Sequence, residues 1–405
     1  MSKPVKLSIV GGGGFYVRPV LSAIANFDEV DELVLVGRRR EALDQLIQEL
    51  GIDATAVEAD IFDDNKLRGA LAGSDLVVNA SGPYFKTLMP VLLAAIDSGA
   101  HYCDYSEDWA AVQQARKLDD EVKSKGLTAL LGFGDDPGLG NLLAVHGASQ
   151  LDSTESIVMG WVSEVEATVG DIGENLQSID ESGSISGSLQ SMFNGLIGEI
   201  PVLRDGKITA VRSLQEPTGL VTPSGEVLMA YPFGTAEPVT LPNTIKGVRE
   251  ITSVIGLLPV QANQLMADLC VKIESGDITL EQGVREFFHQ LDQERTKWLG
   301  DGGPTGFFVS GVSITGSKDG QRMRWSGAFR WNWDTITNAE GISTSGTMAL
   351  AAKKLLAGEI DQTGVLAPEE CLDPLPFLEE LTQQFELFED DDQGPINSKF
   401  SILQD

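Results

Sequence analysis

The stretch that decides the fold is VKLSIVGGGG, residues 5–14 of a chain of 405 residues. It joins a short apolar run, Val5–Val10, to four glycines, Gly11, Gly12, Gly13 and Gly14. The pattern of a helix, Val17–Ala25, comes next. Glycines between a strand and a helix let the backbone approach a pyrophosphate, and the helix end offers N–H groups and a positive dipole. The stretch therefore predicts a dinucleotide-binding loop, although neither Tyr16 nor Val17 supplies the third glycine of the full motif.

Strands and helices continue to alternate over the first third of the chain. Short apolar runs predict strands at Val5–Val10, Leu33–Val36, Ala54–Ala59, Leu76–Ala80, His101–Asp104 and Leu127–Leu131. Helical patterns separate them at Val17–Ala25, Glu41–Leu50, Lys66–Leu71, Met89–Ser98 and Ala110–Lys125. Six short apolar strands separated by helices are typical of a doubly wound parallel sheet. The predicted fold class is therefore α/β, with a Rossmann domain at the start of the chain.

The pattern changes after Gly140. Alternating, strand-like segments occur at Ser156–Val162, Thr305–Thr315 and Arg322–Trp331, between helical segments at Leu189–Leu196 and Leu280–Leu291. This mixture indicates an α+β domain with a largely antiparallel or mixed sheet. Helical patterns return at Met348–Leu356 and Phe377–Phe385, and an acidic run at Glu386–Asp392 is typical of a solvated tail.

Composition and charge exclude several classes of function. With 42% hydrophobic and 22% charged residues the chain is able to form buried cores, while its formal net charge of −31 opposes binding to nucleic acid or anionic membranes. Three widely spaced cysteines, Cys103, Cys270 and Cys371, favour neither a metal site nor a disulfide framework. The absence of a signal-like or membrane-spanning apolar run adds to the expectation of a cytoplasmic protein.

Three arginines follow the second predicted strand, in the sequence Gly37-Arg38-Arg39-Arg40. An acidic residue here would bind the ribose 2′-hydroxyl of NAD, whereas arginine suits the 2′-phosphate of NADP. Basic residues at a helix start oppose the helix dipole, which favours an anionic ligand over a merely solvated patch. Arg38 and Arg39 therefore favour NADP over NAD, with NAD left possible.

Acidic residues end two further strands. Asp60 follows the third strand and is a candidate for the adenine side of the cofactor, or alternatively for a helix cap. Asp104 ends the fifth strand, on the edge of the sheet where we expect contacts with ribose or substrate. His101, at the start of the same strand, is expected to be structural.

The loop after the fourth strand reads Ser81-Gly82-Pro83-Tyr84. Loops at the carboxyl ends of strands face the cofactor in this fold. Ser81, Gly82 and Pro83 are therefore candidate cofactor contacts. Tyr84 is a candidate hydrogen-bond donor or general acid near the nicotinamide, with a purely structural role as the alternative.

The sixth strand is followed by Gly134-Asp135-Asp136-Pro137-Gly138. Two adjacent carboxylates at the expected crossover between domains are able to bind a substrate ammonium or to take part in proton transfer. The alternative is a capped, solvated turn. Asp136 is the residue of this pair that we predict to be catalytic.

Together these motifs resemble the saccharopine dehydrogenase-like family of NAD(P)-dependent oxidoreductases. The resemblance is carried by the glycine loop, Gly37-Arg38, Asp60, Ser81-Gly82-Pro83-Tyr84, His101-Tyr102-Cys103-Asp104, Gly134-Asp135-Asp136-Pro137-Gly138 and the segment Gly358–Pro374. It extends over residues 1–145 and 343–385 and is much weaker over 146–342. It implies hydride transfer at a carbon–nitrogen bond, with Tyr84 and Asp136 at the positions of the family's Gly-Pro-Tyr and Asp-Pro-Gly sites.

The resemblance also implies an architecture. Residues 1–145 and 343–390 would form the Rossmann domain, residues 146–342 an inserted α+β domain for substrate and dimer contacts, and residues 391–405 a C-terminal tail. The resulting candidate cofactor-binding residues are Gly11, Gly12, Gly13, Gly14, Phe15, Arg38, Arg39, Asp60, Ser81, Gly82, Pro83 and Asp104. No metal is expected, because the cofactor supplies the difficult chemistry.

Three functions are compatible with these residues. The first is an NADP-dependent oxidoreductase acting on the C–N bond of an amino-acid-like or polyamine-like small molecule, as a homodimer. The second is an NADPH-dependent reductase of C=C or C=O bonds. The third is a dinucleotide-binding sensor or interaction protein without catalysis.

Overall fold

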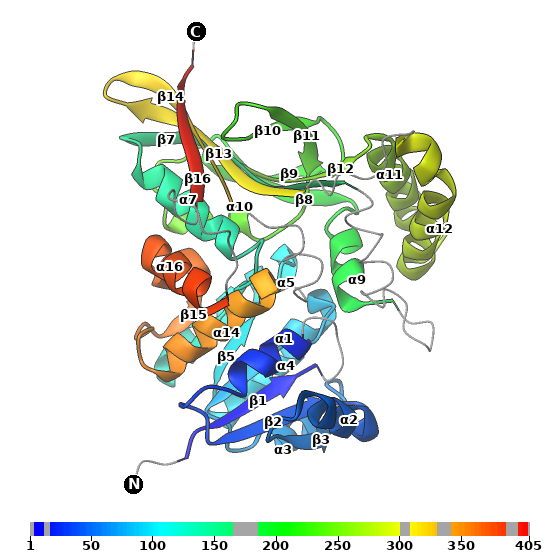
Figure 1. Cartoon of the computed structure of the whole chain (residues 1–405), viewed down its shortest axis with the longest axis vertical. Coiled ribbons are helices and arrows are strands. Elements are labelled where there is room, and N and C mark those ends of the chain that lie inside the picture. The colour runs from blue at the N-terminus through cyan, green and yellow to red at the C-terminus, as the bar shows by residue number, and fades with distance from the viewer. Residues whose placement is uncertain are drawn as a thin grey trace. The chain divides into compact units, whose positions relative to one another are not determined.

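The structure is a computed structural model that describes residues 4–11, 17–164, 185–299, 308–329, 342–385 and 396–403 (Figure 1). The chain divides into two compact units. The first unit consists of Met1–Leu139 and Asn338–Leu372, and the second of Gly140–Thr337 and Asp373–Asp405. Each unit therefore combines two separate parts of the chain.

A seven-stranded sheet forms the centre of the first unit. Its strands are β1 (Lys6–Val10), β2 (Glu32–Gly37), β3 (Thr55–Glu58), β4 (Leu76–Asn79), β5 (His101–Asp104), β6 (Thr128–Leu130) and β15 (Gly364–Leu366). All pairs are parallel, in the order β15-β6-β5-β4-β1-β2-β3. The central strands are buried almost end to end, as expected when helices cover both faces of a parallel sheet. The predicted α/β fold class is confirmed.

Helices pack on both faces of this sheet. They are α1 (Val17–Ile24), α2 (Arg40–Leu50), α3 (Asp64–Leu71), α4 (Tyr84–Ser98), α5 (Trp109–Ala115), α6 (Asp119–Ser124), α14 (Ile342–Leu356) and α15 (Pro368–Cys371), with a short 3₁₀ turn at Arg116–Leu118. Helix α14 contacts α1, β4 and β5, while α4 contacts α3 and α5 (Figure 1). The late segment 342–372 thus completes a sheet that the first 130 residues begin.

A mixed nine-stranded sheet forms the second unit. Its strands are β7 (Ser153–Glu164), β8 (Glu199–Arg204), β9 (Lys207–Arg212), β10 (Thr218–Val221), β11 (Val227–Pro232), β12 (Glu250–Leu258), β13 (Phe308–Lys318), β14 (Gln321–Phe329) and β16 (Ile396–Ile402). The main order is β10-β11-β12-β7-β13-β14-β16, and β8 pairs with β12 and β9. Only β7 and β12 pair in parallel, so the expected mixed α+β domain is confirmed.

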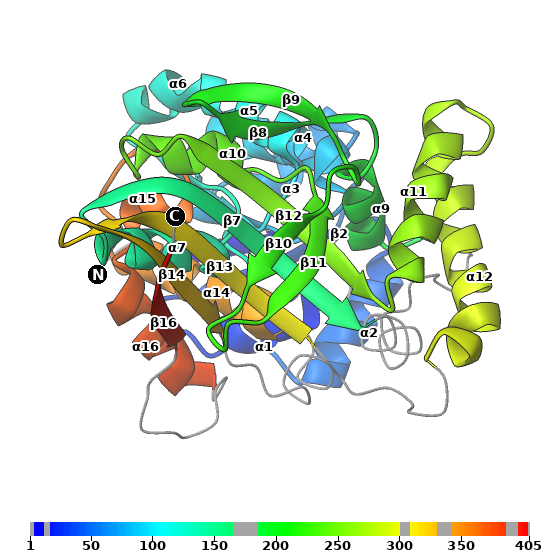
Figure 2. The same ribbon diagram turned by 90° about the horizontal axis from the view of Figure 1, so that it is seen from above.

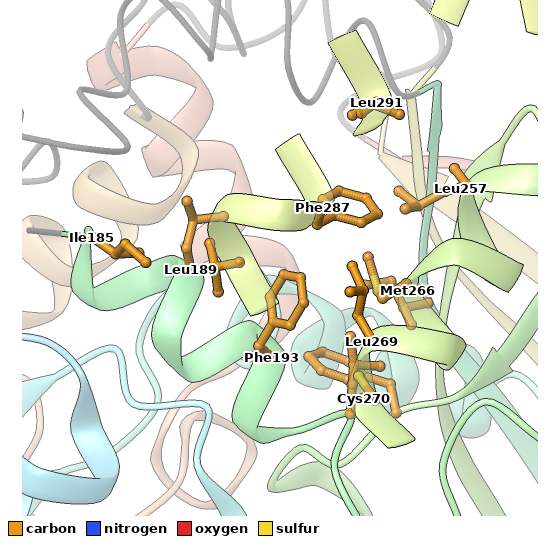
Figure 3. Packing of buried hydrophobic residues seen from close by; sticks show 14 residues of the cluster. Ile185, Leu189, Phe193, Leu257, Met266, Leu269, Cys270, Phe287 and Leu291 are labelled. Atoms are coloured by element: carbon orange, nitrogen blue, oxygen red, sulfur yellow. The ribbon is translucent and has the colours of Figure 1, made fainter. Parts of the chain in front are cut away.

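The helices of the second unit build a core of their own. They are α7 (Leu139–Ser149), α9 (Gly187–Asn194), α10 (Glu237–Thr240), α11 (Gln261–Glu274), α12 (Leu280–Leu299) and α16 (Pro374–Phe385), with a 3₁₀ turn at Leu241–Asn243. Helices α11 and α12 lie side by side (Figure 2). Phe193, Met266 and Phe287 join α9, α11 and α12 into one apolar cluster at the end of β12 (Figure 3).

Two expected boundaries differ from the structure. The predicted Rossmann segment 343–390 extends too far, because α16 belongs to the second unit. The predicted tail 391–405 contains β16, which pairs with β14 along seven residues and so extends the second sheet. The acidic run Glu386–Asp392 lies outside the described residues. In the described part of the chain, no helix has both the length and the apolar character needed to cross a membrane.

Candidate functional site

The strand order of the first unit reverses at β1. Strands β2 and β3 lie on one side of β1, and β4, β5, β6 and β15 lie on the other. In open α/β sheets, ligands bind outside the carboxyl ends of the strands at such a reversal. The residues that follow β1, β2, β3, β4, β5 and β6 are therefore the ones to compare with the predicted site.

Gly11 ends β1 in a conformation that only glycine adopts readily. Its φ is +135°, and a Cβ atom there would lie 2.6 Å from the main-chain carbon and oxygen of Ala80. The Gly11 N–H also donates to the Val36 carbonyl at 3.0 Å. Gly11 is therefore required for the close approach of the chain after β1 to the loop after β4.

The rest of the predicted glycine loop, Gly12, Gly13, Gly14 and Phe15, lies outside the described residues. On its far side, α1 begins at Val17, whose side chain is fully buried. The two described ends of the loop fit a nucleotide-binding turn between a strand end and a helix start.

Arg38 and Arg39 follow β2, where we expect the 2′-phosphate of NADP. Both are exposed, and neither forms an ion pair with any described residue, whereas Arg40 pairs with Asp44 at 3.5 Å. Arg39 occupies the cap position of α2 without making a side-chain cap. Two unpaired guanidinium groups at a helix N-terminus raise the local positive potential and suit a phosphate group.

Asp60 follows β3, beside the end of β2, because the Ala59 N–H donates to the Gly37 carbonyl at 2.9 Å. Its carboxylate accepts the Phe62 N–H at 3.0 Å, while Asp63, not Asp60, caps α3. The turn presents the Phe62 ring with 65% of its surface exposed. Sequence reasoning did not single out this aromatic ring, which is of a kind able to stack on a purine.

The loop after β4 is held by hydrogen bonds within the chain. The Ser81 N–H and hydroxyl both donate to the Asn79 side-chain oxygen, at 3.0 and 2.5 Å. Pro83 occupies the N-cap position of α4 without a side-chain hydrogen bond, and Gly82, which lies between Ser81 and Pro83, is exposed. The buried Tyr84 hydroxyl donates to the Asn79 main-chain carbonyl at 2.9 Å. Burial raises the pKa of this phenol well above its usual value, so Tyr84 stays protonated and ties the loop to β4.

Asp104, at the end of β5, accepts hydrogen bonds that hold the carboxyl ends of neighbouring strands together. Its carboxylate is fully buried and accepts hydrogen bonds from the Ser106 N–H (3.0 Å), the Ser106 hydroxyl (2.8 Å), the Gly132 N–H (3.0 Å) and the Tyr102 hydroxyl (2.8 Å). These donors hold the ends of β5 and β6 together. This internal role replaces the predicted contact with ribose or substrate, because the carboxylate has no surface left for a ligand.

A second buried network links Asp104 to the loop after β4. The Asn79 amide donates to the Tyr102 hydroxyl at 2.9 Å, and Tyr102 in turn donates to Asp104. Sequence reasoning missed both Asn79 and Tyr102 as site residues. The sequence did contain a signal for both residues, because each carries a polar group in an otherwise apolar strand. A polar group buried in a strand requires a hydrogen-bond partner.

Asp135 and Asp136 occupy a tight turn after β6. The Gly134 N–H donates to the Pro137 carbonyl at 3.0 Å, which closes the turn, and a Cβ at Gly138 would overlap the Gly134 carbonyl. The Asp135 Oδ1 atom is buried and has no hydrogen-bond partner in the described chain, and burial raises the pKa of this carboxyl to about 7. Asp136 also has a buried Oδ1 and interacts with other groups of the chain.

The structure thus brings together Gly11, Ser81 and the Asp104 network, since hydrogen bonds and close contacts join them. Arg38, Arg39 and Asp60 lie at the ends of the neighbouring strands β2 and β3. No described group of three or more His, Cys, Asp or Glu side chains is arranged to bind a metal ion.

Comparison with known proteins identifies the same region. Residues 7–130 match the family model of the saccharopine dehydrogenase NADP binding domain. A Caenorhabditis elegans "Lipid droplet localized protein" is 28% identical over 138 residues, which are 32% of this chain and 32% of the relative. The match therefore spans about a third of that curated relative.

Among solved structures, the apo saccharopine dehydrogenase (L-Glu forming) of Saccharomyces cerevisiae has a similar fold. The TM-score is 0.66 at 17% sequence identity, and the similarity covers 98% of this chain and 100% of the yeast chain. The likeness therefore includes the second unit, for which the sequence resemblance is weakest.

Proposed function

Because residues 7–130 match the saccharopine dehydrogenase NADP binding domain and the fold of the whole chain resembles that enzyme, we propose that the chain is a saccharopine dehydrogenase-like NAD(P)-dependent oxidoreductase that transfers hydride at a carbon–nitrogen bond. The observation that carries the proposal is the matched NADP domain, together with Arg38 and Arg39 after β2, which form no ion pair with any described residue. The substrate is an amine or its imine, of an amino-acid-like or polyamine-like small molecule.

The described residues fit NADP. Gly11 allows the chain after β1 to pass close to Ala80, Arg38 and Arg39 would bind the 2′-phosphate, and Asp60 and the exposed Phe62 would border the adenine. When bound, NADPH supplies the hydride that reaches the imine carbon. The remaining requirement is a proton for the imine nitrogen, which the protein or water must provide.

Asp135 is our proposed proton donor for that nitrogen. A carboxyl with a pKa of about 7 is protonated in a large fraction of molecules at neutral pH and loses its proton without a large penalty. Asp136, which the sequence predicts to be catalytic, then serves as the contact for the substrate amine. The Tyr84 hydroxyl donates a hydrogen bond to a main-chain carbonyl, so Tyr84 acts as a positioning residue for the loop that carries Ser81–Pro83.

The charge of the protein favours a cationic substrate. A net charge of −31 attracts amines and repels compounds that carry several carboxylates. Several described arginines of the second unit are already paired, as Arg212 is with Glu274 and Arg249 with Asp205, although the buried Nε of Arg324 has no described partner. These observations support an amine or polyamine in preference to a tricarboxylate such as saccharopine.

The test measures NADPH oxidation against panels of imines, generated from amines and oxo acids, and of enones and simple ketones. We expect turnover with imines only. Turnover with enones or ketones alone would replace the proposal by a C=C or C=O reductase, and tight NADPH binding without any turnover would favour a sensor. Arg38→Glu should weaken NADPH binding about 100-fold and NADH binding much less, because only NADPH carries the 2′-phosphate.

We also propose a homodimer located in the cytoplasm. Light scattering on the purified chain tests the oligomeric state, and cell fractionation tests the location. The name of the worm relative assigns that protein to lipid droplets. For this chain, the acidic charge opposes binding to anionic lipid surfaces, so we expect it in the soluble fraction.

A further inference from the structure

Four buried polar side chains gather around the short helix α10 in the second unit. They are Thr235, Glu237, Thr240 and Ser253, which we call the α10 cluster, and at most 2% of any of them is exposed. Glu237 and Thr240 lie three residues apart and so share one face of the helix. Helix α10 packs against β8 and β12, and Ser253 belongs to β12.

The cluster lacks donors for its buried oxygen atoms. Glu237 Oε1, Thr235 Oγ1 and Thr240 Oγ1 are buried and have no hydrogen-bond partner among the described residues. Among the described residues, the Glu237 carboxylate accepts one hydrogen bond, a long one from the Ser253 hydroxyl to Oε2 at 3.4 Å. A buried carboxylate without a cation or a full set of donors is strongly unfavourable, so the cluster is built for a group that it does not itself contain.

The chemistry of the missing group follows from the oxygen atoms. An ammonium group carries one positive charge and three N–H donors, which match one carboxylate and two or three hydroxyl oxygens. A divalent metal would require more carboxylate ligands, and no described cluster of His, Cys, Asp and Glu provides them.

We propose that the α10 cluster is a binding site for the ammonium group of an amine, with Glu237 as its counter-ion. The inference goes beyond the proposed function and does not depend on it. Binding of a small amine to the cluster requires neither NADP nor turnover, so it is testable independently.

The test measures thermal unfolding of the full chain in methylammonium chloride, against sodium chloride at equal ionic strength. At ten times its dissociation constant, methylammonium should raise the midpoint for the wild type by roughly 3–5 °C. Glu237→Gln keeps the shape but removes the charge and should abolish this rise. Thr240→Val should reduce it, and Glu226→Gln, a matched change at an exposed glutamate, should leave it intact.

An equal methylammonium response in the wild type and Glu237→Gln would overturn the inference, as would no response in the wild type. A Glu237-dependent methylammonium response without turnover on any imine would sustain the site and remove the proposed function.

Discussion

Asp135 is the side chain through which pH acts most directly on this protein. Burial raises its pKa in the folded state from 3.8 to about 7. The folded protein therefore binds a proton more tightly than the unfolded chain, and the stability due to this proton is complete below pH 4 and lost as the pH rises through 7. The same ionisation removes the proposed proton donor of imine reduction.

We expect Asp135→Asn to make the midpoint of thermal unfolding less dependent on pH between 4 and 7, and to make the protein more stable than the wild type at pH 8. It should also lower the rate of imine reduction about 100-fold and abolish its decline above pH 7. Calorimetry and pH–rate profiles measure these effects, with Asp136→Asn as the matched comparison. If the unfolding midpoints of Asp135→Asn and the wild type change with pH in the same way, Asp135 is not the group that causes the pH dependence of stability.

Individual site residues differ in how far the sequence predicts them. The positions of Gly11 and Arg38 at the ends of β1 and β2 could be predicted from the strand pattern. Their contacts with a cofactor stay predictions, based on a glycine between strand and helix and an arginine at a helix start. Asp104 could not be assigned correctly. A carboxylate at the end of a strand has the same sequence pattern whether it faces a ligand or, as here, donors from the next two loops.

At the scale of the elements, the site depends on how closely β1 approaches β4. Gly11→Ala would force a Cβ to within 2.6 Å of the Ala80 carbonyl group, at a φ of +135° that L side chains rarely adopt. We expect this substitution to displace the loop after β4, lower the stability of the protein by about 2–4 kcal/mol and weaken NADPH binding at least tenfold. Fluorescence titration and urea unfolding measure the two effects.

Gly69→Ala is the control for that substitution. Gly69 lies inside α3, and a Cβ there would meet nothing within 4 Å. Alanine should stabilise the helix by about 0.5–1 kcal/mol and leave NADPH binding unchanged. If Gly11→Ala binds NADPH as well as Gly69→Ala does, the close approach of β1 and β4 is not needed for the cofactor.

The predicted elements were most accurate where each strand is buried on both faces. The apolar runs of the first unit correspond to β1 through β6, because such runs have few other uses in a soluble protein. Strand β15 was missed, since three residues far along the chain carry no pattern of their own and are recruited by the edge of β6. Strands β8 to β12 were also missed, and for β9 and β10 the reason is that exposed and buried residues do not alternate along them.

At the scale of the whole molecule, neither unit is one continuous stretch of chain. Residues 1–139 alone would lack β15 and α14, so β6 would become an unprotected edge and the surfaces of α1, β4 and β5 that α14 covers would be exposed. We therefore expect this fragment to aggregate. A fusion of 1–139 to 338–372 through a glycine–serine linker should be monodisperse and unfold cooperatively.

Size-exclusion chromatography and circular dichroism distinguish the two polypeptides. The fusion tests whether residues 338–372 are sufficient to complete the fold of the first unit, since it contains no part of the second unit. Cooperative unfolding of the 1–139 fragment by itself would show that α14 and β15 add little to the first unit.

The chain passes between the two units three times, near residues 139, 337 and 372. During synthesis, the ribosome must therefore deliver nearly all of the second unit before the last strand of the first sheet exists. The nucleotide-binding half emerges first but is completed late, and its β6 edge stays open while more than 230 residues are translated between Leu130 and Gly364. The insertion that gives this protein its second domain thus also sets a period in which the nascent chain depends on protection from aggregation.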